Sequence, residues 1–227
     1  MKTLELLLKS LSGLLFLLLI MGVTLFVPFG SFTFYLAWIY LGVFTISIVL
    51  ITIYLFLFDK HLLKSRLAAG PISETRKTQK VIQTAAGLAF LGIFVVSAFD
   101  YKYKWSAVPL TLPYVADLFC TLAFILIFYV FKQNTFLSAT IEIQEKQKVV
   151  STGLYGIVPH PMYTGVVILL FFTPLALGSF IGLFPVLILF IVIIFRVIDE
   201  ERELKQKLPG YKEYIEEVKY RLIPFVF

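Results

Sequence analysis

Long, uninterrupted apolar runs dominate this chain of 227 residues. A helix needs about 20 apolar residues to cross the hydrocarbon core of a bilayer, whereas the strands of membrane barrels alternate apolar and polar positions. The runs here are continuous, so they favour helices. Four long runs cover residues 11–29, 32–58, 81–99 and 108–131, and two shorter ones cover 161–177 and 180–195. The sequence therefore predicts an all-α integral membrane bundle with about six transmembrane helices, the last two forming a C-terminal hairpin.

The composition agrees with this fold class. Hydrophobic residues make up 59% of the chain and charged residues 15%, whereas soluble domains average about 45–50% and 25%. The first apolar run is too long for a typical signal-peptide core and lacks a following cleavage pattern. Cys120 is the single cysteine, which excludes an intrachain disulfide and a cysteine-based metal site. With only His61 and His160 available, we predict no metal site.

The distribution of basic residues predicts the topology. If the N-terminus is cytoplasmic, 18 of the 20 Lys and Arg residues fall in inside segments, and only Lys102 and Lys104 fall outside. Basic residues concentrate on the cytoplasmic side of membrane proteins, so we expect a multi-pass protein with both termini inside. The net charge of +6 then fits anionic lipid headgroups and requires no nucleic acid partner. Short connections between spans favour a bacterial or archaeal plasma membrane, and nothing specifies an oligomeric state.

The polar segments suggest an organisation in two parts. Residues 1–80 form an N-terminal transmembrane hairpin with a cytoplasmic loop, and residues 81–227 form a membrane core whose functional region is 149–224. We expect 59–80 to be a loop around Gly70-Pro71. Residues 140–150 are expected as a surface loop or short amphipathic element. The tail over 198–219 is expected as a charged, amphipathic helix interrupted at Leu208-Pro209-Gly210.

The most informative stretch lies where a polar segment enters the fifth apolar run. Pro161 suits the first position of a helix, because its missing N–H has no partner there in any case. His160 then precedes the helix, and Gly153 and Gly156 allow the approaching chain to turn tightly. Irregular backbone at membrane depth is tolerated where it is buried in protein or lines a cavity. Taken alone, His160 and Tyr163 fit an interfacial histidine and a belt tyrosine; the downstream residues favour a site instead.

Those downstream residues follow the sixth apolar run. Arg196 and Glu200 are four apart on one helix face, a spacing that allows them to pair. Glu201 points about 100° away from Glu200, a direction that allows it to face a site at the mouth of the bundle. The alternative is a charged, solvated flank of a membrane span. Because the hairpin goes out and returns, we expect His160 and Glu200 to lie side by side. Aromatic rings that attract cations are available at Tyr155, Tyr163, Tyr211 and Tyr214.

Together these residues resemble the superfamily of isoprenylcysteine carboxyl methyltransferases and phospholipid methyltransferases. The matching positions cover about a third of the chain: Gly153, Tyr155, Val158, His160, Pro161, Tyr163, Arg196, Glu200, Glu201, Leu204, Gly210, Tyr214, Arg221 and Pro224. The chain departs from the family pattern at Leu154, Gly156 and Pro159, where the family has Pro, Arg and Arg.

The resemblance implies S-adenosyl-L-methionine (SAM) as cofactor and methyl transfer to a lipophilic acceptor, such as a prenylcysteine-type carboxylate, that enters from the membrane. It implies catalytic roles for His160, Glu201 and Arg196. It also implies a cofactor site formed by Tyr155, His160, Pro161, Tyr163, Glu200, Glu201, Tyr211 and Tyr214. Two alternatives remain open: an NADPH-dependent membrane reductase, against which Met162 argues by replacing the Asn of that pattern, and a non-catalytic membrane protein that retains the fold.

Overall fold

The computed structural model describes residues 3–70, 72–74, 76–141 and 147–227. Within these ranges the secondary structure is entirely helical, as predicted. The helices are α1 (Thr3–Phe29), α2 (Tyr35–Phe58), α3 (Lys60–Leu67), α4 (Lys77–Tyr103), α5 (Leu112–Gln133), the 3-10 turn η1 (Gly153–Gly156), α6 (Pro161–Ala176), α7 (Leu183–Lys207) and α8 (Tyr211–Glu217).

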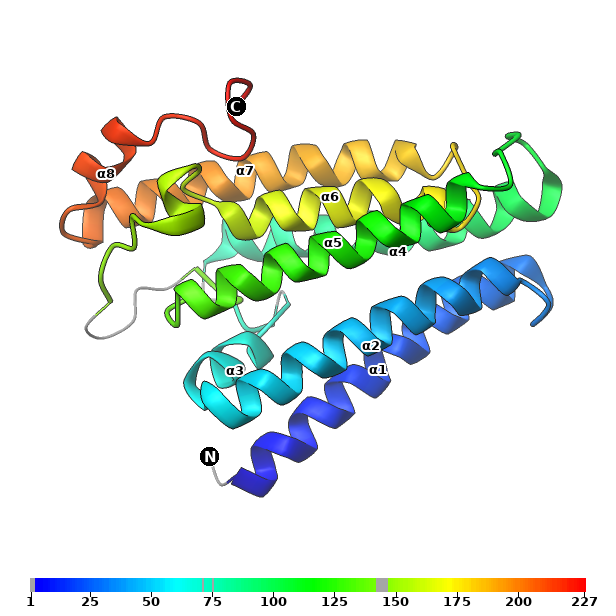
Figure 1. The fold of residues 1–227 in the computed structure, drawn as a ribbon, viewed down its shortest axis with the longest axis horizontal. Coiled ribbons are helices and arrows are strands. Elements are labelled where there is room, and N and C mark those ends of the chain that lie inside the picture. Colours follow the sequence, from blue (N-terminus) through cyan, green and yellow to red (C-terminus); the bar gives the residue numbers. More distant parts are fainter. Residues whose placement is uncertain (1–2, 71, 75, 142–146) are drawn as a thin grey trace.

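The long helices lie along the length of one bundle, and successive helices run in opposite directions (Figure 1). Helix α4 packs against α1 and α7, and α5 packs against α2 and α6. Figure 1 shows α3, α8 and the N-terminus at one end, and the α1–α2, α4–α5 and α6–α7 turns at the other. Helices α1, α2, α4 and α5 are long and apolar enough to cross a membrane, and α6 is a shorter apolar helix. In α7 an apolar part, residues 183–195, precedes a charged half. The predicted helical membrane bundle is confirmed.

The α6–α7 turn is fastened to the loop between α4 and α5. Gly178 adopts a positive φ of 73°, and a Cβ there would lie 2.9 Å from side-chain atoms of Leu36 and Tyr101. The buried carboxylate of Asp100 accepts hydrogen bonds from the hydroxyls of Ser106 and Ser179, both at 2.6 Å. This arrangement directs α7 back along α6, so the start of α6 and the end of α7 lie at the same end of the bundle.

The segment after α2 contains a helix that the sequence prediction treated as loop. Helix α3 begins directly after Asp59, whose side chain accepts a hydrogen bond from the backbone N–H of Leu62 at 2.9 Å. Such a cap satisfies one of the free N–H groups of a helix start. The predicted tail is confirmed, because α7 ends at Lys207 and Gly210, with φ of 81°, precedes α8. The expected element at 140–150 lies partly outside the described residues.

Candidate active site

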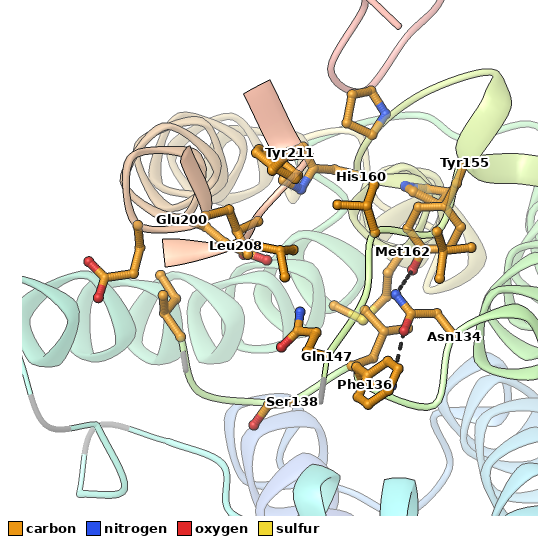
Figure 2. Close-up of a pocket in the computed structure, with 18 of the residues that line it drawn as sticks. Asn134, Phe136, Ser138, Gln147, Tyr155, His160, Met162, Glu200, Leu208 and Tyr211 are labelled. Carbon is orange, nitrogen blue, oxygen red and sulfur yellow. Dashed lines mark hydrogen bonds between the residues drawn. The ribbon is translucent and has the colours of Figure 1, made fainter. Parts of the chain in front are cut away.

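A pocket lies where the start of α6, the charged half of α7 and α8 meet (Figure 2). The residues that line it combine aromatic rings with acids and a few amides. They include Asn134, Phe136, Gln147, Tyr155, His160, Met162, Tyr163, Arg196, Glu200, Glu203, Leu204, Leu208, Tyr211 and Tyr214. The pocket is thus formed by residues from two parts of the chain, 134–163 and 196–214.

The turn η1 forms one wall. Gly153, with φ of 61°, allows the chain to pass close to Gln133, whose side-chain oxygen accepts from the N–H of Leu154 at 3.0 Å. The hydroxyl of Tyr155 accepts from the side-chain amide of Asn134 at 3.0 Å, as Figure 2 shows. The hydroxyl of Tyr214 in α8 donates to the backbone oxygen of Tyr155 at 2.6 Å. The wall is therefore held from both α5 and α8.

His160 is the residue that precedes α6, as predicted, with non-helical φ and ψ of −123° and 56°. Its backbone N–H donates to the backbone oxygen of Arg221 at 3.3 Å. Its Nε2 lies 3.4 Å from Glu201 Oε1, and Arg221 Nε lies 3.0 Å from the same oxygen. The C-terminal segment thus closes over His160 and brings a guanidinium to Glu201.

Glu201 is 4% exposed and belongs to this buried ion cluster. Burial disfavours its charged form, but the neighbouring His160 and Arg221 outweigh that effect, so the pKa of the Glu201 carboxyl lies below its usual value. Glu201 lies behind His160 and is not among the residues that line the described pocket. The sequence predicted that Glu201 faces the site; in the structure it supports a residue that does.

Tyr163 stands between Arg196 and Glu200. The Nε of Arg196 donates to the Tyr163 hydroxyl at 2.8 Å, and that hydroxyl donates to Glu200 Oε2 at 2.8 Å. The structure therefore confirms that the hairpin brings the start of α6 beside Glu200. The direct pair that the spacing of Arg196 and Glu200 allows is not formed, because the tyrosine hydroxyl lies between the two side chains.

Arg196 instead uses its other nitrogens on residues that the sequence analysis did not identify. Its Nη1 donates to Glu74 at 3.0 Å and to the side-chain oxygen of Gln79 at 2.9 Å, and its Nη2 donates to the backbone oxygen of Ala139 at 2.7 Å. Glu74 and Gln79 are both buried. No local pattern signals this contact, because the partners are separated by about 120 residues of sequence.

The Tyr211 hydroxyl is a buried polar group without a hydrogen-bond partner among the described residues. Burial, and to a lesser extent the charges of Glu201 and Glu200, raise the pKa of Tyr211 above its usual value, so the phenol stays protonated at neutral pH. A buried donor without a partner is costly unless a ligand or water satisfies it. Tyr211 lines the pocket, so its free hydroxyl fits a site for a polar ligand.

Most of the predicted site residues meet at this pocket. Its lining includes Tyr155, His160, Pro161, Tyr163, Arg196, Glu200, Tyr211 and Tyr214, and of the predicted set only Glu201 is set back. Sequence reasoning missed Asn134 and Met162. Asn134 follows the last residue of α5, and Met162 occupies a position within the His-Pro-x-Tyr motif, accepting through its sulfur from Arg66 at 3.4 Å.

These features define a helical membrane protein with a polar pocket, rich in tyrosine, at one end of its bundle. A family model described as PEMT, phospholipid methyltransferase, matches residues 110–210, from just before α5 through α7. The match confirms, for this part of the chain, the resemblance to the superfamily of isoprenylcysteine carboxyl methyltransferases and phospholipid methyltransferases, a superfamily of membrane methyltransferases. Comparisons with curated proteins and with solved structures give no match.

Proposed function

We propose that the chain catalyses SAM-dependent methyl transfer to a lipophilic acceptor at the predicted cytoplasmic face of a membrane. The observation that carries this proposal is the pocket itself. Within the segment that matches a methyltransferase family, Glu200 and the rings of Tyr155 and Tyr163 surround a site beside the apolar hairpin. An acid and aromatic faces together suit a cationic ligand.

The polar residues of the pocket fit this cofactor. Glu200 receives its hydrogen bond from the neutral hydroxyl of Tyr163, so its negative charge is not cancelled by a directly bonded guanidinium. The free hydroxyl of Tyr211 offers a donor to a polar group of the ligand. When bound, SAM supplies a methyl group on a positively charged sulfur. Tyr155, Tyr163, Tyr211 and Tyr214 would supply the walls and Glu200 the opposite charge.

His160 is the residue suited to a proton transfer. It lines the pocket, and its Nε2 lies 3.4 Å from the carboxylate of Glu201 behind it. An amine acceptor is an ammonium ion at neutral pH and must lose a proton, here to His160, before its lone pair can bond to the methyl carbon. SAM, when bound, would supply the methyl group, and the electron pair of the carbon–sulfur bond would stay on sulfur. A carboxylate or thiolate acceptor is already ionised and needs no base.

The charges of the site bear on the class of acceptor. Among the described lining residues, the permanent cations are Arg196 and Lys148. Arg196 is committed to Tyr163, Glu74 and Gln79, and Lys148 is exposed. A prenylcysteine-type carboxylate would therefore meet no buried, unengaged guanidinium there. This favours an amine acceptor over a carboxylate and makes Arg196 a positioning residue rather than a catalytic one.

Ligand binding tests the proposal. The protein is purified in detergent and its thermal stability is measured with SAM or NADPH. We expect stabilisation by SAM alone, a loss of that effect in Glu200→Gln, and its retention in Glu216→Gln, which changes an exposed acid of α8. Stabilisation by NADPH alone would instead support the reductase alternative. A response to neither ligand at millimolar concentration would favour the non-catalytic one.

A further inference from the structure

A buried polar cluster joins the start of α4 to the charged half of α7. Gln79, which is fully buried, accepts from Arg196 through its oxygen and donates to Asp199 through its nitrogen. Glu74, 3% exposed, accepts from the same Arg196 nitrogen as Gln79. The two residues therefore hold Arg196 from a segment that lies outside the family-matched range of 110–210.

Arg76 makes a second set of contacts between this segment and α7. The guanidinium of Arg76 donates to Asp199 Oδ1 at 2.9 Å and lies 3.6 Å from Glu203. The segment from 74 to 79 thus engages α7 at positions 196, 199 and 203, which recur along one side of a helix. Glu200 lies within this stretch but takes no part in these contacts; its hydrogen bond comes from Tyr163 in α6.

Arg196 and Glu200 do not bond to each other directly, although their spacing on α7 would allow it. Residues four apart on a helix are neighbours, and opposite charges at that spacing attract. Here Arg196 is instead satisfied by Glu74, Gln79, the backbone oxygen of Ala139 and Tyr163. Those partners take four of the five N–H donors of Arg196, and none of its described hydrogen bonds goes to Glu200.

We propose that Glu74 and Gln79 are positioning residues that hold Arg196 away from Glu200, and so keep the Glu200 carboxylate available to a cationic ligand in the pocket. The identity of that ligand rests on the proposed function. The way in which Glu74 and Gln79 hold Arg196 does not depend on it. If the charge of Glu74 is removed, the buried guanidinium loses its nearest carboxylate. Arg196 then turns to Glu200, displaces the Tyr163 hydroxyl and neutralises the charge that faces the pocket.

A double-mutant cycle on thermal stability tests the arrangement without any ligand. The melting temperature is measured for the wild type, Glu74→Gln, Glu200→Gln and the double variant. In the wild-type background Glu200→Gln has little effect, because a glutamine oxygen still accepts from Tyr163. In the Glu74→Gln background we expect the same change to cost about 2–4 °C more, as for the loss of one moderate interaction in a chain of this size. Equal shifts in both backgrounds would overturn the proposal.

Ligand binding supplies the second arm. Glu74→Gln should weaken binding of SAM, whose sulfur is positively charged, about tenfold when Glu200 is present and have no further effect in Glu200→Gln. A purely structural role of Glu74 would give the same loss in both backgrounds. If Glu74→Gln does not yield folded protein, the same cycle is run with Gln79→Met, which removes the other side-chain acceptor of the same Arg196 nitrogen. Absence of binding by the wild type would refute the proposed function, while the thermal cycle would still decide this inference.

Discussion

The hydroxyl of Tyr214 donates to the backbone oxygen of Tyr155 at 2.6 Å, and so joins α8 to the turn that leads into α6. Both side chains are buried and both line the pocket. The sequence suggested that the two tyrosines supply aromatic faces to a cation. The structure adds that Tyr214 holds Tyr155 in place, because the bond runs from the Tyr214 side chain to the backbone of η1. The shape of the pocket therefore depends on the C-terminal tail.

Replacing Tyr214 by Phe removes this bond and keeps the ring. The backbone oxygen of Tyr155 loses its tyrosine donor in a buried place, which costs about 1–3 kcal/mol of stability. We expect a lower melting temperature and weaker binding of S-adenosylhomocysteine, measured by thermal shift and equilibrium binding. Tyr220→Phe, at an exposed position, is the control and should change neither. Unchanged values for Tyr214→Phe would show that α8 does not hold η1.

Replacing Tyr211 by Phe should separate stability from binding. The Tyr211 hydroxyl is buried without a partner among the described residues, so its removal relieves a desolvation penalty of about 1 kcal/mol or more. We expect the melting temperature without ligand to stay the same or rise. Binding of S-adenosylhomocysteine should weaken several-fold, because the ligand loses a donor. Equal binding by the variant and the wild type would exclude this hydroxyl from the site.

Gly153 is required by the geometry of η1. Its φ is 61°, and a Cβ there would lie 2.8–2.9 Å from the side-chain amide of Gln133. Gly153→Ala therefore combines backbone strain of about 1 kcal/mol with a clash against the group that accepts from Leu154. We expect a lower melting temperature and weaker ligand binding. Gly13→Ala, where a Cβ meets open space within α1, should be neutral or stabilising, which circular dichroism melts would show.

The Glu201 cluster predicts an acid-dependent loss of stability. The pKa of Glu201 in the folded protein lies below its ordinary value of 4.5. Its pairing with His160 and Arg221 therefore stabilises the fold above that value and is lost as the pH falls through the folded pKa. Glu201→Gln should cost about 1–3 kcal/mol at neutral pH, because His160 and the partly exposed Arg221 lose their carboxylate partner. As the pH falls below 4.5, the melting temperatures of the two proteins should approach each other, because the Glu201 carboxylate of the wild type becomes protonated. A difference that does not shrink on acidification would contradict the pairing.

The elements that the sequence predicted well are those with local causes. Continuous apolar runs predicted the long helices, and Pro161 after His160 predicted the start of α6. The hairpin that brings His160 and Glu200 together followed from two apolar runs joined at Gly178. These features depend on residues close in sequence, where hydrophobicity and backbone preference decide.

What the sequence could not predict depends on tertiary contacts. The spacing of Arg196 and Glu200 favours a direct pair, but Glu74 and Gln79 compete for the guanidinium from more than 100 residues away. Glu201 lies in the same charged stretch of sequence as Glu200, which suggests exposure to solvent. In the structure the C-terminal segment buries Glu201 beneath Arg221. Helix α3 had a local signal, the cap of Asp59, which was hidden by the polar composition around it.

The predicted division of the chain at residue 80 remains a prediction, but the structure shows how the two parts meet. Glu74 and Gln79 fall on the N-terminal side of that boundary and contact Arg196 in the C-terminal part. Helix α1 also packs against α4, and α2 against α5. The site of the C-terminal part is thus completed by residues that precede it.

The central claim is methyl transfer from SAM, and transfer of a labelled methyl group tests it most directly. The protein, reconstituted in lipid vesicles, is incubated with methyl-labelled SAM and either phosphatidylethanolamine or a farnesylated cysteine, and label in the lipid fraction is counted. We predict incorporation by the wild type and by Glu216→Gln, more with the amine than with the carboxylate, and a loss of at least tenfold in Glu200→Gln, about 1.4 kcal/mol or more. Incorporation that is unchanged in Glu200→Gln, or absent from the wild type with both acceptors, would contradict the account.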